Sequence, residues 1–381
     1  MREASIRLFR AGRDLFEEIL SGCSACKNRI QLTESQMKET GGFSMQTIHP
    51  DSVPKIMLND GREAPCIGMG TFGSDRFTAD QVAEAVYGAI KAGYRMFDCA
   101  ACYGNEAMIG DVFQKAFSDG ICKREDLFIM TKAWNDMHGD GDILIALAKS
   151  LKDLKLDYVD MYFLHWPFPN YHAPYCDVDS RNPDSKPFSV ERFMKTWRQM
   201  ERLVDMGLTR GIGMSSMTIP KLKAVLPLCR IKPAMCEFEE HPCFQQEELF
   251  CYLRGHGIQP VGFMPLGSPQ RPERDMEPGD VADMKTPIMQ EIAAAHKCHP
   301  ALICLKWAVQ RGAIPIPFSV HEAEYVSNLA STIDGDPLTE EEMDRIQLLE
   351  SNNRLVKGQV FLWPGARDWH DLWDENGEIV Q

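Results

Sequence analysis

Short hydrophobic runs alternate with longer segments in which hydrophobic and polar positions follow a helical period, from about residue 56 to the C-terminus. The runs are six to eight residues long and are separated by glycine, proline and other turn-forming residues, as is typical of buried strands. They predict strands over residues 66–72, 95–100, 127–132, 158–165, 210–216, 234–240, 259–266 and 313–320.

The segments between these strands predict amphipathic helices. Residues 78–93 begin with the N-cap candidate Thr78, and residues 189–207 begin with Ser189 and end at Gly207. Eight strand–helix units over about 270 residues predict a (β/α)8 TIM barrel. A doubly wound sheet is the alternative, but no predicted strand is followed by a G-x-G-x-x-G turn.

The first 50 residues are predicted to be an N-terminal extension, helical or disordered, ahead of a single catalytic domain over residues 51–381. Residues 7–20 have helical apolar spacing, and residues 31–42 are polar. The acidic residues of this extension fit a transit peptide badly, and its apolar run is too short for a signal peptide. A second hypothesis is translation from Met45, which native peptides from before Met45 would refute.

Composition and charge exclude several classes of function. The chain has 381 residues, is 44% hydrophobic and carries a net charge of −14, which argues against nucleic acid or an anionic membrane as a partner. No apolar run reaches the roughly 18 residues of a membrane span. The 13 cysteines lack paired zinc-ligand spacing, which suits a reducing cytoplasm.

Polar residues stand at the ends of three consecutive predicted strands. They are Asp98 with Tyr103, then Lys132, then His165. Active sites of TIM barrels gather at the carboxyl ends of the strands, so these four side chains are expected to converge. A tyrosine keeps its proton at neutral pH and can donate it to a carbonyl oxygen.

The other three residues support such a proton donor. Lys132 would favour the phenolate left behind, Asp98 would hold that ammonium, and His165 would orient the carbonyl. Because these four residues include neither a nucleophile nor a metal-ligand set, the electron source is expected to be a nicotinamide cofactor.

Several stretches together make the chain resemble the aldo-keto reductase superfamily from about Ile56 onward. They are LNDG, IGMGTFG, FDCAACYGNE, FIMTKAW, YFLHWP, RGIGMSS and EEHP. The resemblance implies that Asp98, Tyr103, Lys132 and His165 form a catalytic tetrad. It also implies an NAD(P)-dependent monomer that interconverts an aldehyde or ketone and an alcohol.

The same resemblance implies positions for the cofactor. Its nicotinamide end would lie against Ser215, Ser216, Glu237 and Phe263, and its pyrophosphate along Leu266, Gly267 and Ser268. Family members commonly carry glutamine where this chain has Glu237. A carboxylate there would attract the oxidised, positively charged nicotinamide, which predicts alcohol oxidation as the favoured direction.

The strongest departure follows the eighth strand. NADP-preferring relatives carry a lysine and an arginine where this chain has Phe318 and Glu324, whereas Ser319 and Asn328 match the pattern. A carboxylate would repel a 2′-phosphate but accept hydrogen bonds from ribose hydroxyls. NAD(H) is therefore the predicted cofactor, with NADP(H) as the alternative.

The substrate is predicted to be a small polar or sugar-like carbonyl or alcohol. Trp134 and Trp166 would wall its pocket, and the C-terminal segment is acidic and polar. Two other functions stay open. The altered cofactor positions allow a binding or regulatory relative, and His165, Glu237, Glu239 and His241 are residue types that would also suit a metal-dependent barrel enzyme.

Overall fold

The computed structural model describes residues 47–73, 76–172, 182–267 and 276–380. The range 1–46, where most of the predicted N-terminal extension lies, is outside the described residues. Already at Ile48 the chain is buried, and the Ile48 N–H donates to the Ala92 carbonyl. None of the described helices has the length and apolar character needed to cross a membrane.

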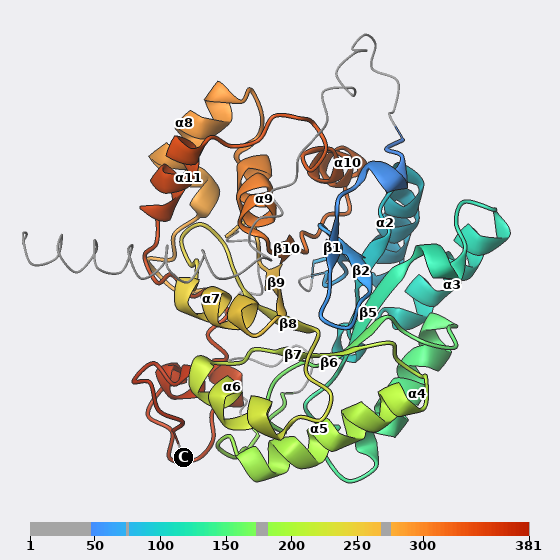
Figure 1. The fold of residues 1–381 in the computed structure, drawn as a ribbon, viewed down its shortest axis with the longest axis vertical. Coiled ribbons are helices and arrows are strands. Elements are labelled where there is room, and N and C mark those ends of the chain that lie inside the picture. Colours follow the sequence, from blue (N-terminus) through green and yellow to red (C-terminus); the bar gives the residue numbers. More distant parts are fainter. Residues whose placement is uncertain (1–46, 74–75, 173–181, 268–275, 381) are drawn as a thin grey trace, which may run out of the picture. The chain divides into compact units, whose positions relative to one another are not determined.

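Eight parallel strands form the centre of the fold (Figure 1), in the spatial order in which they follow one another along the chain. Their bounds are β3 (Met69–Gly70), β4 (Met96–Asp98), β5 (Phe128–Ala133), β6 (Met161–Leu164), β7 (Ile212–Ser215), β8 (Met235–Glu239), β9 (Gln259–Phe263) and β10 (Ile314–Pro315). Two backbone hydrogen bonds join the first strand to the last: the N–H groups of Gly68 and Gly70 donate to the carbonyls of Pro315 and Pro317. These bonds close the sheet, and the predicted (β/α)8 barrel is confirmed.

Except for β5, the strands are shorter than predicted, most of all where the barrel closes. A Cβ atom at Gly70 would lie only 3.0 Å from the carbonyl oxygen of Ile316. The absence of a side chain at Gly70 therefore lets β3 approach the segment after β10 closely.

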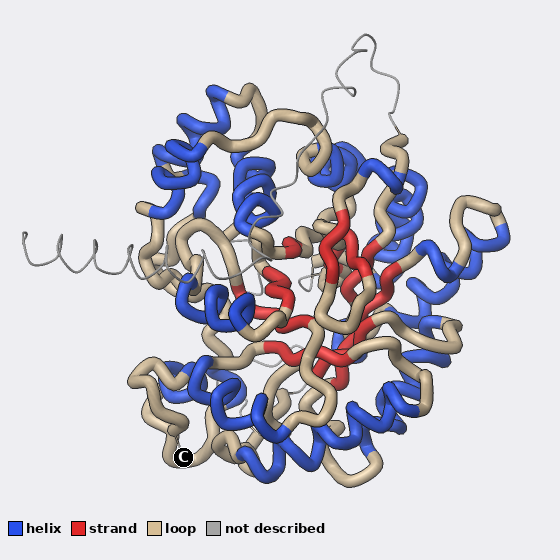
Figure 2. The backbone as a smooth tube through the Cα atoms, in the orientation of Figure 1, coloured by secondary structure: helices blue, strands red, loops and turns tan. Residues whose placement is uncertain are grey.

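Helices surround the strands on the outside of the barrel (Figure 2). The two predicted from their ends are confirmed: α2 (Ala79–Ala92) starts at Thr78 with a capping box, and α5 (Val190–Asp205) is capped by the Ser189 side chain. The others are α3 (Glu106–Ser118), α4 (Asp142–Leu154), α6 (Ile219–Val225), α7 (Glu247–Gly255), α8 (Pro287–Ala295), α9 (Pro300–Arg311), α10 (Glu322–Ala330) and α11 (Glu340–Gln347).

An antiparallel hairpin of β1 (Lys55–Met57) and β2 (Glu63–Pro65) precedes the barrel and was not predicted as a separate element. Its residues Leu58 and Ala64 pack into the hydrophobic interior of the barrel. Next to them, the Asn59 side chain donates to the carbonyl of Pro233, just before β8, at 2.9 Å. The hairpin therefore covers the end of the barrel where the strands begin.

The C-terminal segment packs over the opposite end. Trp166 and Phe168, from the loop after β6, form a buried aromatic cluster with Phe361, Trp363 and Trp373. Trp166 lies 4.5 Å from Phe361 and 5.4 Å from Trp373 between ring centroids. This packing brings the C-terminal segment beside the predicted site.

A buried polar group fastens this segment to β8. The Glu239 carboxylate accepts hydrogen bonds from the backbone N–H groups of Leu355 and Val356, at 2.6 and 2.8 Å. His241 lies between Glu239 and Asp283, with its ring nitrogens 3.2 and 2.9 Å from their carboxylate oxygens. Hydrogen bonds to the two carboxylates raise the pKa of His241 to about 9, although burial opposes the rise.

This raised pKa predicts a pH dependence of stability. The cationic form of His241 stabilises the fold fully below about pH 6.5, its unfolded value, and the contribution is lost as pH rises through about 9. In urea titrations, the destabilisation caused by His241→Gln should shrink by up to about 3 kcal/mol across that window. If the free energy of unfolding changed with pH equally in the unaltered protein and in His241→Gln, a charged His241 would be contradicted.

Candidate active site

The four residues predicted to act together lie at one end of the barrel. Asp98 is the last residue of β4, Lys132 lies near the end of β5, and His165 directly follows β6. Tyr103 ends a 3-10 turn (Ala101–Tyr103) that follows β4. Gly104, with φ of 68°, ends that turn in a left-handed conformation that glycine adopts without strain.

Lys132 is the centre of the group and is fully buried. Its ammonium nitrogen lies 2.6 and 2.5 Å from the two carboxylate oxygens of Asp98 and 3.4 Å from the Tyr103 hydroxyl. It also donates to the Cys99 carbonyl at 3.1 Å, and Oε1 of Glu237 is 3.5 Å away. One cation therefore faces two carboxyl groups and a phenol.

The surroundings fix the protonation states of Tyr103 and His165. Burial raises the pKa of Tyr103 well above its ordinary value, although Lys132 opposes the rise, so the phenol holds its proton. Burial, together with the nearby charge of Lys132, lowers the pKa of His165 well below its ordinary value. A neutral imidazole beside a protonated phenol can donate or accept hydrogen bonds but adds no charge.

Aromatic rings and a thiol hold His165. Its ring lies edge-on to Tyr103 and to Trp134, with centroids 5.8 and 5.1 Å apart. The Cys102 sulfur is 3.5 Å from Nδ1 of His165. Sequence reasoning missed Cys102, and also Phe361, whose ring lies 5.9 Å from Trp134. Cys102 stands next to Tyr103 in the chain, which was the available signal, and the signal for Phe361 was its place in the C-terminal segment.

Glu237 is the second carboxyl of the site. It is buried on β8, and burial together with the charge of Asp98 raises its pKa to about 8, with Lys132 opposing. Its Oε2 has no hydrogen-bond partner in the part of the chain that the structure describes. Ser215 of β7 pairs with Glu237 in register. The unpaired buried oxygen of Glu237, on a strand whose neighbour carries Ser215 in register, fits a ligand amide, as a nicotinamide carboxamide would supply.

The remaining predicted nicotinamide and pyrophosphate positions follow β7 and β9. The Ser215 and Ser216 hydroxyls are 3.4 Å apart, and Ser216 has φ of 57°, in the left-handed region. Phe263 is half-buried at the end of β9 and packs against the barrel interior. Leu266 and Gly267 follow, whereas Ser268 lies outside the described residues.

The residues predicted to read the ribose lie around the start of α10. Phe318 packs edge-on to Phe77, with ring centroids 5.9 Å apart. The Ser319 hydroxyl donates to the Glu324 carboxylate at 2.6 Å, and Asn328 is buried one turn further along the helix. Glu324 itself is exposed in the first helical turn, where carboxylates are stabilised by the helix dipole.

The two predicted pocket tryptophans have different surroundings. Trp134 is half-buried and lies against His165. Trp166 is only 5% exposed, within the aromatic cluster under the C-terminal segment. The structure therefore brings Trp134 to the tetrad and places Trp166 behind it, supporting Phe361.

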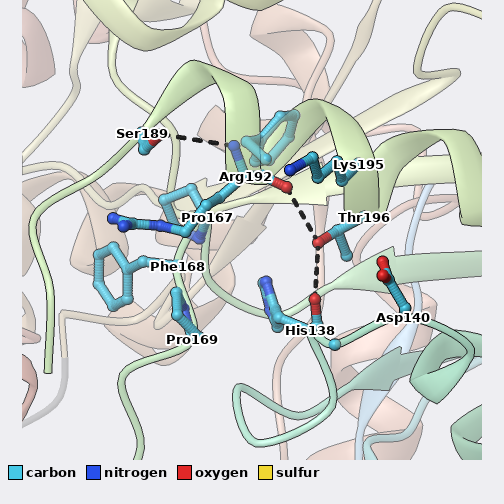
Figure 3. Close-up of a pocket in the computed structure, with 11 residues that line it drawn as sticks. His138, Asp140, Pro167, Phe168, Pro169, Ser189, Arg192, Lys195 and Thr196 are labelled. Carbon is cyan, nitrogen blue, oxygen red and sulfur yellow. Dashed lines mark hydrogen bonds between the residues drawn. The ribbon is translucent and has the colours of Figure 1, made fainter. Parts of the chain in front are cut away.

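A separate cavity of about 210 Å³ lies beside α5 (Figure 3) and contains none of the predicted site residues. Its lining combines rings such as Phe168 and Phe193 with the basic residues Arg192 and Lys195. The Thr196 hydroxyl, at its edge, donates to the His138 carbonyl at 3.2 Å. Because Lys195 pairs with Glu191 at 2.9 Å, part of this positive charge is already neutralised.

Two of the residues that suggested a metal-dependent enzyme, Glu239 and His241, are bound to other protein groups. Both ring nitrogens of His241 face carboxylates, and both oxygens of Glu239 accept backbone N–H groups. Within the described ranges, no three histidine, cysteine or acidic side chains converge as metal ligands. These contacts make the group a structural anchor for the C-terminal segment.

Comparison with known proteins adds independent findings. The model of the aldo/keto reductase family matches residues 66–350. An aldo/keto reductase of Synechocystis is 37% identical over 326 residues, which are 85% of this chain and 98% of that protein. A crystal structure of a Bombyx mori aldo-keto reductase in complex with NADP has a TM-score of 0.70 and 31% identity, covering 80% of this chain and 94% of that chain.

Two curated relatives differ in their cofactor. The NADPH-dependent D-xylose reductase of Candida boidinii is 36% identical over 311 residues, covering 78% of this chain and 94% of that protein. The NADH-dependent D-xylose reductase of Candida parapsilosis is 35% identical over 311 residues, covering 79% and 94%. Relatives at nearly the same identity therefore use different dinucleotides.

Proposed function

Because this chain belongs to the aldo/keto reductase family, we propose that Tyr103 is the proton donor and acceptor of its reaction and that Asp98, Lys132 and His165 assist it. The protein is an NAD(P)-dependent oxidoreductase that interconverts a carbonyl compound and an alcohol. The observation that carries the proposed roles is the contact of the buried Lys132 ammonium with both the Asp98 carboxylate and the Tyr103 hydroxyl.

Each side chain has a distinct part in the proposed mechanism. The bound nicotinamide supplies or takes the hydride. Tyr103 gives its proton to the carbonyl oxygen as negative charge develops there, and Lys132 stabilises the phenolate that remains. Asp98 keeps Lys132 charged and in place. Neutral His165, held by Trp134 and Cys102, orients the carbonyl by a hydrogen bond from its ring.

We infer a preference for NAD(H) from the surroundings of Glu324. Its carboxylate is exposed near the start of α10 and is fixed by the Ser319 hydroxyl. It would repel a 2′-phosphate and accept hydrogen bonds from ribose hydroxyls. The test is a titration of the purified protein with NAD(H) and NADP(H), followed by tryptophan fluorescence. Tighter binding of NADP(H) would overturn the preference, and binding of neither would favour a non-enzymatic relative.

A charge substitution sharpens this test. Glu324→Arg should tighten NADP(H) binding by about tenfold or more, since a bidentate cation replaces a repelling carboxylate, and should change NAD(H) binding much less. The matched control is Glu322→Gln, which is in the same helical turn and is also exposed. Equal effects of the two substitutions would place the 2′-phosphate elsewhere.

We further propose a small polar or sugar-like substrate. Trp134 supplies an aromatic wall next to His165, and the C-terminal segment brings Phe361 to the same place. The curated D-xylose reductases among the relatives act on a substrate of this class. We also infer a monomeric cytoplasmic protein, and free thiols such as Cys66, Cys99 and Cys236 support a reducing compartment.

A further inference from the structure

We propose that Glu237 is the proton reservoir of the site: it holds its proton while reduced cofactor is bound, and it gives that proton to Tyr103 through Lys132 as the cofactor becomes oxidised. This inference rests on the proposed function, because it needs the nicotinamide beside β8. It adds a role that the four tetrad residues do not supply.

The arrangement of charge around Lys132 supports this role. Asp98 is bound to the ammonium by two short hydrogen bonds, at 2.5 and 2.6 Å. Oε1 of Glu237 is 3.5 Å away, and Oε2 has no hydrogen-bond partner among the described residues. A single buried cation can neutralise one carboxylate, and the closer one takes that role. Glu237 is therefore the group that keeps its proton.

Among the residues that the structure describes, no other group near Glu237 can neutralise it. The titratable side chains that face it are Asp98 from β4, Tyr103 from the turn after β4, and Lys132 from β5. On its own strand, Cys236 is buried and burial raises the pKa of its thiol, so it stays neutral. With Asp98 ionised and Glu237 protonated, the group has no net charge. The positive charge of an oxidised nicotinamide would then favour ionisation of Glu237.

The spacing of the groups supports the same role. Lys132 lies 3.4 Å from the Tyr103 hydroxyl and 3.5 Å from Glu237, so its ammonium is close to both the proton donor and the reservoir. After Tyr103 has protonated the carbonyl oxygen, an N–H of Lys132 breaks as the phenol O–H forms again. The Glu237 O–H then breaks and restores the ammonium.

Over these proton transfers, electrons, protons and charge balance within the site. The electron pair arrives at the carbonyl carbon as hydride from the reduced cofactor, and the proton comes from Glu237. The cofactor gains one positive charge and Glu237 gains one negative charge, so the net charge of the site does not change. Oxidation of an alcohol runs the same transfers backward and reprotonates Glu237. A glutamine at this position has no proton to give.

The experiment measures protons rather than turnover. Purified protein in weakly buffered solution at pH 7 is mixed with NAD⁺ or with NADH, and a pH indicator dye reports the protons released per cofactor bound. We expect more than half a proton per site for NAD⁺ and close to none for NADH, because the pKa of Glu237 is about 8 before binding. The affinity for NAD⁺ relative to NADH should rise toward tenfold per pH unit between pH 6 and 8.

Two variants assign the proton to its source. Glu237→Gln should abolish the release and flatten the pH dependence while still binding both forms. The control is Glu106→Gln, which changes a buried carboxyl with a raised pKa that binds Thr131 and Ser150. It should leave the release intact.

The possible failures are distinguishable. If neither cofactor form binds the protein, the proposed function fails. If both bind and NAD⁺ releases as many protons from Glu237→Gln as from the unaltered protein, or none from either, the reservoir is wrong and the proposed function stands.

Discussion

Tyr103→Phe should lower kcat by about 10² to 10⁴-fold while cofactor affinity stays within about twofold. The substitution removes the hydroxyl 3.4 Å from the Lys132 ammonium and leaves the aromatic ring beside His165 and Phe72. The carbonyl oxygen would then gain charge with no proton donor in reach. Steady-state kinetics in both directions and fluorescence titration of the cofactor measure the two quantities.

A second tyrosine provides the matched control. Tyr162 lies fully buried on β6, and within the described ranges its hydroxyl has no hydrogen-bond partner. Tyr162→Phe removes the same atom without removing a contact of the site, so kcat should stay within about twofold and stability should not fall. If Tyr103→Phe kept more than a tenth of the activity, the proton would come from another group.

Lys132→Met should abolish measurable turnover and destabilise the protein by about 3–5 kcal/mol. Stability falls because the buried Asp98 carboxylate would no longer have the cation to which it makes two short hydrogen bonds. An uncompensated buried charge costs more than the pair itself contributes. Urea unfolding followed by circular dichroism measures the change in the free energy of unfolding.

Two further variants separate stability from chemistry. Adding Asp98→Asn to Lys132→Met removes the unpaired charge and should restore part of the stability but none of the activity. Lys221→Met removes another buried lysine, bound to Asp374 at 2.5 Å beneath the C-terminal segment. It should destabilise the fold while the remaining folded protein keeps its kcat. Equal loss of kcat in both lysine variants would indicate a structural role for Lys132.

Two residues of the site depart from the pattern that the family resemblance implies. Glu237 and Glu324 are both carboxylates at positions where the family resemblance led us to expect an amide or a cation. The structure gives them different environments, since Glu237 is buried against Lys132 and Glu324 is exposed at a helix start. The first is therefore suited to holding a proton and the second to discriminating by charge between dinucleotides.

The sequence alone determined the order of strands and helices and the end of the barrel where Asp98, Tyr103, Lys132 and His165 lie. The positions of strands and helices depend on local features, namely side-chain periodicity and capping residues. For this reason Thr78 and Ser189 correctly predicted the starts of two helices. The carboxyl ends of consecutive parallel strands must also meet at one end of a barrel.

Only the tertiary structure decided which groups share one cation. β5 and β8 are not neighbours in the sheet, so the approach of Glu237 to Lys132 depends on the closure and curvature of the whole barrel. The arrival of Phe361 beside Trp134 likewise depends on how the C-terminal segment folds back over the strands. Such contacts join residues that are distant in the chain, and neither periodicity nor a local motif records the distance between them.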